Sequence, residues 1–128
     1  MIPAPLSRIL VVDDEPDLRS LLRLCLAEVG GYQVQVCGSG EEALQHLDRD
    51  PYDLVLMDVM MPDLDGPSTL TTLRGRGVHI PIVFLTAKVH PSEVAHLVSL
   101  GALGVIGKPF DPMTLAQEVR RLWEAHHG

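Results

Sequence analysis

The most constraining feature of the sequence is a regular alternation between short apolar runs and longer segments with helical periodicity. Runs such as Ile-Leu-Val-Val are almost entirely apolar, which is typical of strands that are covered on both faces. We expect strands at Arg8–Val12, Gln33–Cys37, Asp53–Met57, Ile80–Leu85 and Gly104–Ile106. This order of strands and helices favours a parallel sheet with right-handed crossovers and helices on both faces.

Helical signals fill the segments between these runs. The first segment has one apolar face, and it is expected to begin near Pro16 and to end at Gly30-Gly31. Further helices are predicted to open at Ser39–Glu42, which has capping-box spacing, and at Gly66-Pro67, Pro91 and Asp111-Pro112. The result is an α/β fold of five strand–helix pairs. We expect a single domain over residues 1–128 with a core of about 8–123.

Charge and composition argue against several classes of function. The chain has 10 Lys and Arg against 17 Asp and Glu, a formal net charge of −7, and this balance argues against nucleic acid or an anionic membrane as a partner, since both require a basic face. No apolar stretch is long enough to span a membrane, and the first five residues are too short and uncharged for a secretory signal. Cys25 and Cys37 lie in apolar patterns and are interpreted as reduced core residues. We therefore expect a cytoplasmic protein.

Polar side chains follow four of the expected strands, and the carboxyl ends of parallel strands meet at one edge of a sheet. The residues concerned are Asp13, Asp14, Glu15, Asp58, Thr86 and Lys108. Clustered carboxylates repel each other unless a cation intervenes, and an all-oxygen cluster favours Mg²⁺. Lys108 and Thr86 are suited to contact phosphoryl oxygens, and Asp58 is suited to attack phosphorus and form an acyl phosphate.

Each of these features has a simpler explanation when it is taken alone. Asp13–Glu15 could be the acidic first turn of a helix, Asp58 an ordinary turn residue and Lys108 a solvated loop residue. Asp63–Gly66 resembles a fragment of a calcium loop, but the downstream ligands are absent and we interpret it as a turn. Convergence of the polar residues at one sheet edge favours a functional site over the simpler explanations.

Four motifs, in order along the chain, resemble response regulator receiver domains, and the resemblance runs from about Arg8 to Trp123. The motifs are Val11–Pro16 (Val-Val-Asp-Asp-Glu-Pro), Leu56–Gly66, Leu85–Ala87 and Gly107–Phe110. The resemblance implies a doubly wound, flavodoxin-like sheet of five parallel strands in the order 2-1-3-4-5.

The resemblance also implies a role for each site residue. Asp58 is the phosphoacceptor, and the implied Mg²⁺ ligands are Asp13, Asp14, Asp58 and the backbone carbonyl of Met60. Thr86 is the switch hydroxyl, with the small Ala87 beside it, and Lys108 contacts the phosphoryl group. The bond before Pro109 is expected to be cis.

Two positions depart from the family pattern. Many receivers have an aromatic ring three residues before the lysine, where this chain has Val105, so the coupling between phosphorylation and output is expected to differ. Met60 and Lys88 occupy positions that tune loss of the phosphoryl group in the family. Because Met60 cannot orient water by hydrogen bonding, we hypothesise a phosphorylated state of moderate to long lifetime.

The expected function is that of a receiver in a two-component system or phosphorelay, not of an enzyme with a separate substrate. Its expected partners are a sensor histidine kinase or histidine phosphotransfer protein, and a downstream protein that contacts the face formed by the fourth helix, fifth strand and fifth helix. The chain is expected to be a monomer or a weak dimer. Two alternatives stay open: an interaction module that does not depend on phosphorylation (a pseudo-receiver), and a phosphohydrolase with an aspartyl-phosphate intermediate, disfavoured because Met60 stands where such enzymes carry an acid.

Overall fold

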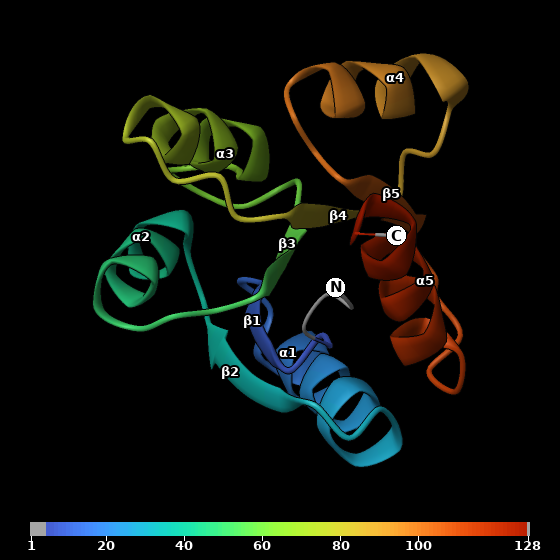
Figure 1. The fold of residues 1–128 in the computed structure, drawn as a ribbon. Helices are drawn as coiled ribbons and strands as arrows, with labels where there is room; N and C mark the ends of the chain where they lie inside the picture. The colour runs from blue at the N-terminus through green and yellow to red at the C-terminus, as the bar shows by residue number, and fades with distance from the viewer. Residues whose placement is uncertain (1–4, 128) are drawn as a thin grey trace.

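A five-stranded parallel sheet lies between two layers of helices in the computed structural model, which describes residues 5–127 (Figure 1). The strands are β1 (Arg8–Val12), β2 (Gln33–Cys37), β3 (Leu54–Asp58), β4 (Ile82–Thr86) and β5 (Gly104–Gly107). Their order across the sheet is β2-β1-β3-β4-β5, which confirms the predicted doubly wound, flavodoxin-like topology. The predicted domain bounds, 1 and 128, and most of the segment examined for a secretory signal lie outside the described residues.

Helices cover both faces of the sheet (Figure 1). They are α1 (Pro16–Arg23), which continues as η1 (Leu24–Val29), then α2 (Gly40–Arg49), α3 (Gly66–Gly75), α4 (Pro91–Ser99) and α5 (Leu115–His127). The first helix and α5 pack on one face, and α2, α3 and α4 pack on the other. The central strands β3 and β4 are buried at every residue, which explains why their sequences are almost continuously apolar.

The predicted strand bounds are right to within two residues. β3 begins one residue later than predicted, because the Asp53 carboxylate accepts the amide protons of Ser7 and Arg8 at 3.0 and 2.8 Å. β4 begins after Pro81, which has no amide proton to donate to a neighbouring strand. β5 extends to Gly107, one residue beyond the predicted end. Each of these shifts moves a strand boundary toward the carboxyl edge of the sheet, where the polar residues gather.

Two helices differ from the prediction in detail. The first helix does end at Gly30, but its last part is π-helical, and the Gly30 amide donates to the Cys25 carbonyl at 3.2 Å. The fifth helix begins at Leu115 and not at Asp111-Pro112. Asp111 instead forms a turn, in which its carboxylate accepts the Met113 amide proton at 2.9 Å.

Helix caps agree with the sequence signals. The Ser39 hydroxyl accepts the Glu42 amide proton at 3.1 Å, as a capping box predicts. The turn interpretation of Asp63–Gly66 holds, since Asp63 has a φ of 67° and the Asp65 carboxylate caps α3 by accepting the Ser68 amide proton at 2.8 Å.

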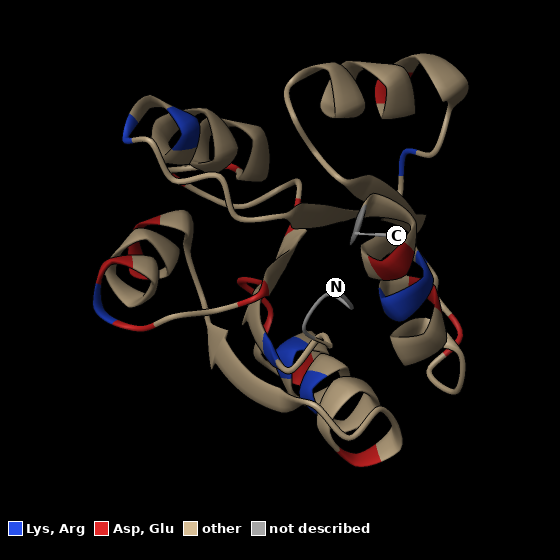
Figure 2. Cartoon of the chain, in the orientation of Figure 1, with Lys and Arg blue, Asp and Glu red and all other residues tan. Residues whose placement is uncertain are grey.

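The surface carries charges of both signs. Acidic and basic residues both occur along α1, α2 and α5 (Figure 2). None of the helices among residues 5–127 combines the length and apolar character that crossing a membrane would require. Cys25 and Cys37 are buried free thiols, as predicted.

Candidate functional site

Strand register brings the predicted polar residues to one edge of the sheet. Val12 is level with Met57 across the β1–β3 pair, so Asp13 follows β1 beside the end of β3, where Asp58 lies. Asp58 is level with Leu85 on β4, and the next residue of β4, Thr86, is level with Gly107 on β5. The side chains that follow four neighbouring strand ends therefore share one rim.

Asp13 is completely buried and most of its polar atoms are engaged. Its amide donates to the Cys37 carbonyl at 3.1 Å, and its Oδ1 accepts the Glu15 amide proton at 2.9 Å. Asp13 Oδ2 is the one buried side-chain oxygen or nitrogen without a hydrogen-bond partner among the residues that the structure describes. Burial raises the pKa of the Asp13 carboxyl above its ordinary value; Asp58 and Asp14 add to the rise, and the Glu15 amide and Lys108 oppose it.

Lys108 supplies the positive charge of the site. Its Nζ lies 3.2 Å from Oδ2 of Asp58 and 3.6 Å from Oδ2 of Asp13. The second distance is an ion-pair contact too long for a hydrogen bond, which is why Asp13 Oδ2 still lacks a donor. The peptide bond between Lys108 and Pro109 is cis, as predicted. The Lys108 amide also donates to the Thr86 carbonyl at 2.8 Å, which ties the end of β5 to the end of β4.

The carboxylates of Asp13, Asp14 and Asp58 form one group, in which an oxygen from each residue lies within 4.8 Å of the others. Asp13 and Asp58 are buried, whereas Asp14 is exposed and leaves one side of the group open to solvent. An oxygen-only donor set with an open side suits Mg²⁺, which keeps several waters. The hydrogen-bond deficit of Asp13 Oδ2 fits this ion as well, because a cation can satisfy a buried carboxylate oxygen that no donor reaches.

The remaining predicted site residues have less direct contacts. The Thr86 hydroxyl is buried and accepts the Lys88 amide proton at 3.0 Å, so its own proton is free to be donated. The Met60 amide donates to Asp58 Oδ1 at 3.3 Å, while the Met60 side chain is 67% exposed. The Met60 amide thus contacts the Asp58 carboxylate, whereas the metal-ligand role predicted for the Met60 carbonyl stays a prediction.

The region around Val105 shows what occupies the place of the family's aromatic ring. Val105 is partly buried and packs against the core beneath α2, α3 and α4. The exposed Val89, in the loop between β4 and α4, lies against Gly107, where a Cβ would be 2.8 Å from Val89 Cγ1. Position 105 thus carries an aliphatic side chain and not a ring, and Val89 lies against the end of β5 nearby.

Two contacts near Asp13 were not predicted from the sequence. Arg19 Nη1 donates to the Asp13 backbone carbonyl at 2.8 Å, although Arg19 lies six residues further along, on the first helix. Glu42 Oε2 accepts the Gly38 amide proton at 2.6 Å in the neighbouring loop. Periodicity places Arg19 on a helix but cannot show that its long side chain reaches back to the preceding loop, so no sequence signal pointed to it.

Comparison with known proteins gives a consistent result. The family described as response regulator receiver domain matches residues 9–120. The transcriptional regulatory protein DltR of Streptococcus agalactiae is 37% identical over 113 residues, which are 88% of this chain and 50% of DltR. The transcriptional regulatory protein PcoR of Escherichia coli is 38% identical over 117 residues, 91% of this chain and 51% of PcoR. The chain thus spans about half the length of these relatives.

Solved structures resemble the chain over nearly its whole length. The receiver domain of the Francisella response regulator 1452 has a TM-score of 0.86 at 28% identity, covering 94% of this chain and 98% of that chain. The chemotaxis response regulator CheY4 of Vibrio cholerae has a TM-score of 0.84 at 29% identity, covering 91% of this chain and 98% of that chain.

Proposed function

The chain belongs to the response regulator receiver domain family of two-component systems, and we propose that it accepts a phosphoryl group on Asp58 in a Mg²⁺-dependent reaction. The observation that carries the proposal is the position of Lys108, whose ammonium lies between Oδ2 of Asp58 and Oδ2 of Asp13 at 3.2 and 3.6 Å. A cation shared by two carboxylates is already placed where a phosphoryl oxygen would need it once Asp58 is modified.

Asp13, Asp14 and Asp58 are the side chains that would hold Mg²⁺, with the Met60 carbonyl as the fourth protein ligand that the family resemblance implies. When bound, the ion neutralises charge on the carboxylates and on the phosphoryl oxygens. The exposed Asp14 leaves the group accessible from solvent, and the buried Asp13 supplies an oxygen that the protein itself leaves without a donor.

The proposed reaction is the transfer of a phosphoryl group from a donor to Asp58. A carboxylate oxygen of Asp58 attacks phosphorus, an O–P bond forms, and the bond from phosphorus to the donor breaks with its electron pair staying on the donor atom. For a phosphohistidine donor that atom is an imidazole nitrogen, which then takes a proton. Lys108 is freed from its ion pair with the Asp58 carboxylate and stays as the counter-charge of the new phosphoryl oxygens. The buried Thr86 hydroxyl can donate its proton to another of these oxygens.

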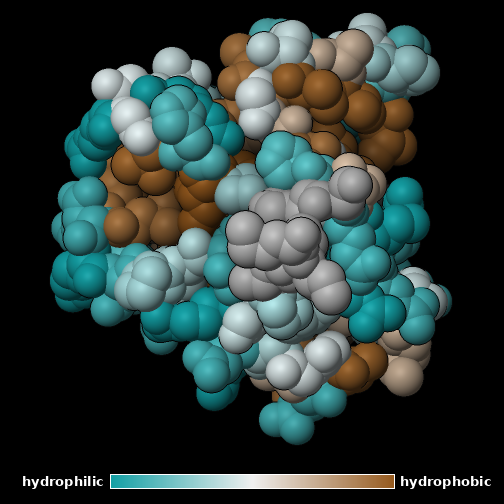
Figure 3. Space-filling view, in the orientation of Figure 1, coloured by the Kyte–Doolittle hydropathy of each residue, from teal (hydrophilic) through white to brown (hydrophobic). Residues whose placement is uncertain are grey.

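The proposed partners follow from this chemistry. A sensor histidine kinase or a histidine phosphotransfer protein supplies the phosphoryl group, and the chain catalyses only its own phosphorylation and dephosphorylation. A downstream protein is proposed to contact the face of α4, β5 and α5. Hydrophobic residues gather over α4 in Figure 3, and Val98 on that helix is exposed. We propose a monomer or weak dimer in the cytoplasm.

The phosphohydrolase alternative is not favoured by any contact at the site. Such enzymes place an acid two residues after the nucleophile, and here that position is Met60, whose side chain is exposed and cannot transfer a proton. The other alternative, an interaction module that does not depend on phosphorylation, is distinguished from the proposed function by the mass measurement described next.

The decisive experiment measures intact mass after incubation with acetyl phosphate and Mg²⁺, with Asp58→Asn as the matched variant. The expected result is a gain of one phosphoryl group that disappears in Asp58→Asn and in the presence of a chelator. A folded chain that gains no mass, beside a reference regulator that does, would overturn the proposal in favour of the phosphorylation-independent module.

A further inference from the structure

Three of the four polar atoms of Asp13 are fixed by the protein. The amide donates to Cys37, Oδ1 accepts from Glu15, and the backbone carbonyl accepts from Arg19 Nη1 at 2.8 Å. Only Oδ2 has no hydrogen-bond partner, and it lies on the side of Lys108 and Asp58. The Oδ1 contact holds the carboxylate directly, and the contacts to the amide and the carbonyl fix the backbone that carries it, so the three together set where Oδ2 points.

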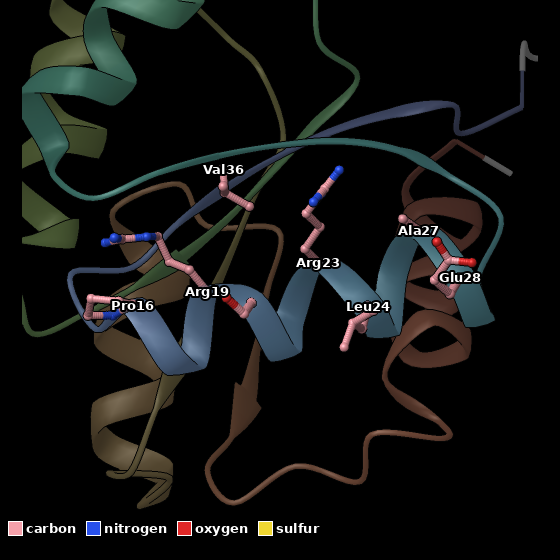
Figure 4. A pocket seen from close by; sticks show the side chains of 8 residues that line it. Pro16, Arg19, Arg23, Leu24, Ala27, Glu28 and Val36 are labelled. Atoms are coloured by element: carbon pink, nitrogen blue, oxygen red, sulfur yellow. The ribbon is translucent and has the colours of Figure 1, made fainter.

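Arg19 is the only one of these partners that reaches Asp13 through a side chain. In Figure 4, Arg19 extends toward the N-terminal end of α1, whereas Arg23, one turn later, points toward β2. Both line a groove of about 450 Å³ along the first helix, together with Pro16, Ser20, Leu24, Ala27, Glu28 and Val36. The two arginines therefore carry equal charge on one helix, but of the two only Arg19 has its guanidinium at the Asp13 carbonyl.

Gly38 provides the space for this contact. A Cβ at Gly38 would lie 2.7 Å from Arg19 Nη1 and 3.5 Å from Arg19 Cζ. The distance to Nη1 is shorter than two such atoms can tolerate, so the guanidinium would have to move. The guanidinium thus lies against the backbone of the loop after β2. Glu42 Oε2 fixes that loop from the other side by accepting the Gly38 amide proton at 2.6 Å. Arg19 therefore joins the loop after β1 to the loop after β2.

We propose that Arg19 is a positioning residue for the cation site, which fixes the Asp13 carbonyl and so directs Asp13 Oδ2 at the Mg²⁺ ion. The inference rests on the proposed Mg²⁺-dependent function and goes beyond the carboxylate ligands themselves. Arg19 contributes a positive charge near a cation site, so its benefit to Mg²⁺ binding has to come from geometry and not from attraction.

Charge and geometry predict opposite changes in Mg²⁺ affinity when Arg19 is removed. Removal of a positive charge near the carboxylates strengthens Mg²⁺ binding if electrostatics alone matters. Loss of the hydrogen bond to the Asp13 carbonyl weakens Mg²⁺ binding if Arg19 orients the ligand. Loss of an outer contact of a metal site typically lowers affinity by about 10–100-fold, and we expect roughly three- to tenfold here because Arg19 acts through the backbone of the ligand.

The experiment is a Mg²⁺ titration of the unphosphorylated chain, followed by backbone amide NMR shifts, for the wild type, Arg19→Ala, Arg23→Ala and Gly38→Ala. Arg23→Ala is the matched control, because it removes the same charge from the next turn of the helix. Gly38→Ala keeps Arg19 but displaces its guanidinium with a methyl group. We expect Arg19→Ala and Gly38→Ala to raise the Mg²⁺ dissociation constant and Arg23→Ala to leave it unchanged or lower it.

The inference is overturned if Arg19→Ala binds Mg²⁺ as tightly as Arg23→Ala. It is also overturned if Arg19→Ala and Gly38→Ala lower stability toward urea in chelator but leave the dissociation constant in place, since that pattern marks a purely structural residue. Should Arg19→Ala fail to fold, Gly38→Ala decides by itself. A wild-type chain that shows no Mg²⁺-dependent shift overturns the proposed function first and the inference with it, a result distinct from wild-type binding that the variants leave unaltered.

Discussion

The ammonium of Lys108 lies 3.2 Å from Oδ2 of Asp58, and the same nitrogen is 3.6 Å from Oδ2 of Asp13. One side chain thus serves as the counter-charge for two buried carboxylates that come from different strand ends. Lys108 therefore has a structural role in addition to the phosphoryl-binding role that we propose for it.

Replacement of this shared cation is expected to destabilise the metal-free chain. Lys108→Ala leaves two buried carboxylates without their counter-charge, and we expect the free energy of unfolding to fall by roughly 1–3 kcal/mol, less than for a fully buried pair because the lysine side chain is 24% exposed. Urea denaturation in chelator measures the effect. Excess Mg²⁺ should recover most of the loss, whereas an equal loss with and without the ion would contradict this explanation.

Removal of the most buried charge is expected to have the opposite effect. Asp13 is desolvated, lies beside Asp58 and Asp14, and has one oxygen without a donor. Asp13→Asn should therefore raise the free energy of unfolding in chelator by about 1–2 kcal/mol, because it removes like-charge repulsion and a buried charge. Thermal unfolding with and without Mg²⁺ tests this: the ion should stabilise the wild type more than Asp13→Asn. A variant less stable than the wild type in chelator would count against it.

The lifetime of the phosphorylated state is expected to depend on Met60. Its side chain is 67% exposed, so a polar residue can replace it without repacking the core. Met60→Gln can hold a water by a hydrogen bond, worth about 0.5–1.5 kcal/mol, and we expect loss of the phosphoryl group to accelerate by about two- to tenfold. Decay of the phosphorylated mass over time gives the rate, with Met60→Leu as the apolar control. Equal rates in the two variants would contradict the hypothesis.

Alkaline pH provides a test of the core beneath β2. Burial, aided by the nearby Glu42 carboxylate, raises the pKa of the Cys37 thiol from 9.0 to about 12. Between these values the unfolded chain loses the thiol proton while the folded chain keeps it, so stability is full below pH 9.0 and falls as the pH rises. From about pH 8 to pH 10 the wild type should lose about 1.4 kcal/mol more than Cys37→Ala. Identical pH profiles in urea denaturation would show that the thiol ionises freely in the fold.

The layered fold could be predicted from the sequence because each face of each element is either buried or solvated. The continuous apolar runs of β3 and β4 arise from burial on both sides, and the amphipathic first helix has one face on the core. Exact bounds could not be predicted, since they depend on contacts distant in sequence. The Asp53 carboxylate, for example, accepts the amide protons of Ser7 and Arg8, which precede it by 46 and 45 positions in the sequence.

The candidate site was predictable for a different reason. Asp58 ends a strand and Asp13 and Lys108 directly follow strands, and the rule that parallel strands end at one edge is enough to bring them together. Arg19 was not predictable, because its contact depends on how a helical side chain folds back over a loop. The same holds for the packing of Val89 on Gly107, which brings the loop after β4 against the end of β5, two segments that no periodic pattern relates.

The backbone of Asp58 also limits which residue can follow the turn after β3. A Cβ at Gly66 would lie 2.5 Å from the Asp58 carbonyl oxygen and 2.8 Å from Phe84 Cε1, and neither the backbone of a buried strand nor a buried ring can move away easily. We expect Gly66→Ala to lower the free energy of unfolding by about 1–3 kcal/mol. Because the strain falls on Asp58, it should also slow phosphorylation by acetyl phosphate.

Gly75, at the other end of α3, is the matched control. A Cβ at Gly75 would have no atom within 4 Å, so Gly75→Ala should instead stabilise the chain by about 0.4–1 kcal/mol and leave phosphorylation unchanged. Urea denaturation and mass measurements on the two variants separate these effects, and a Gly66→Ala chain as stable and as readily phosphorylated as Gly75→Ala would show that the turn is not held against Asp58.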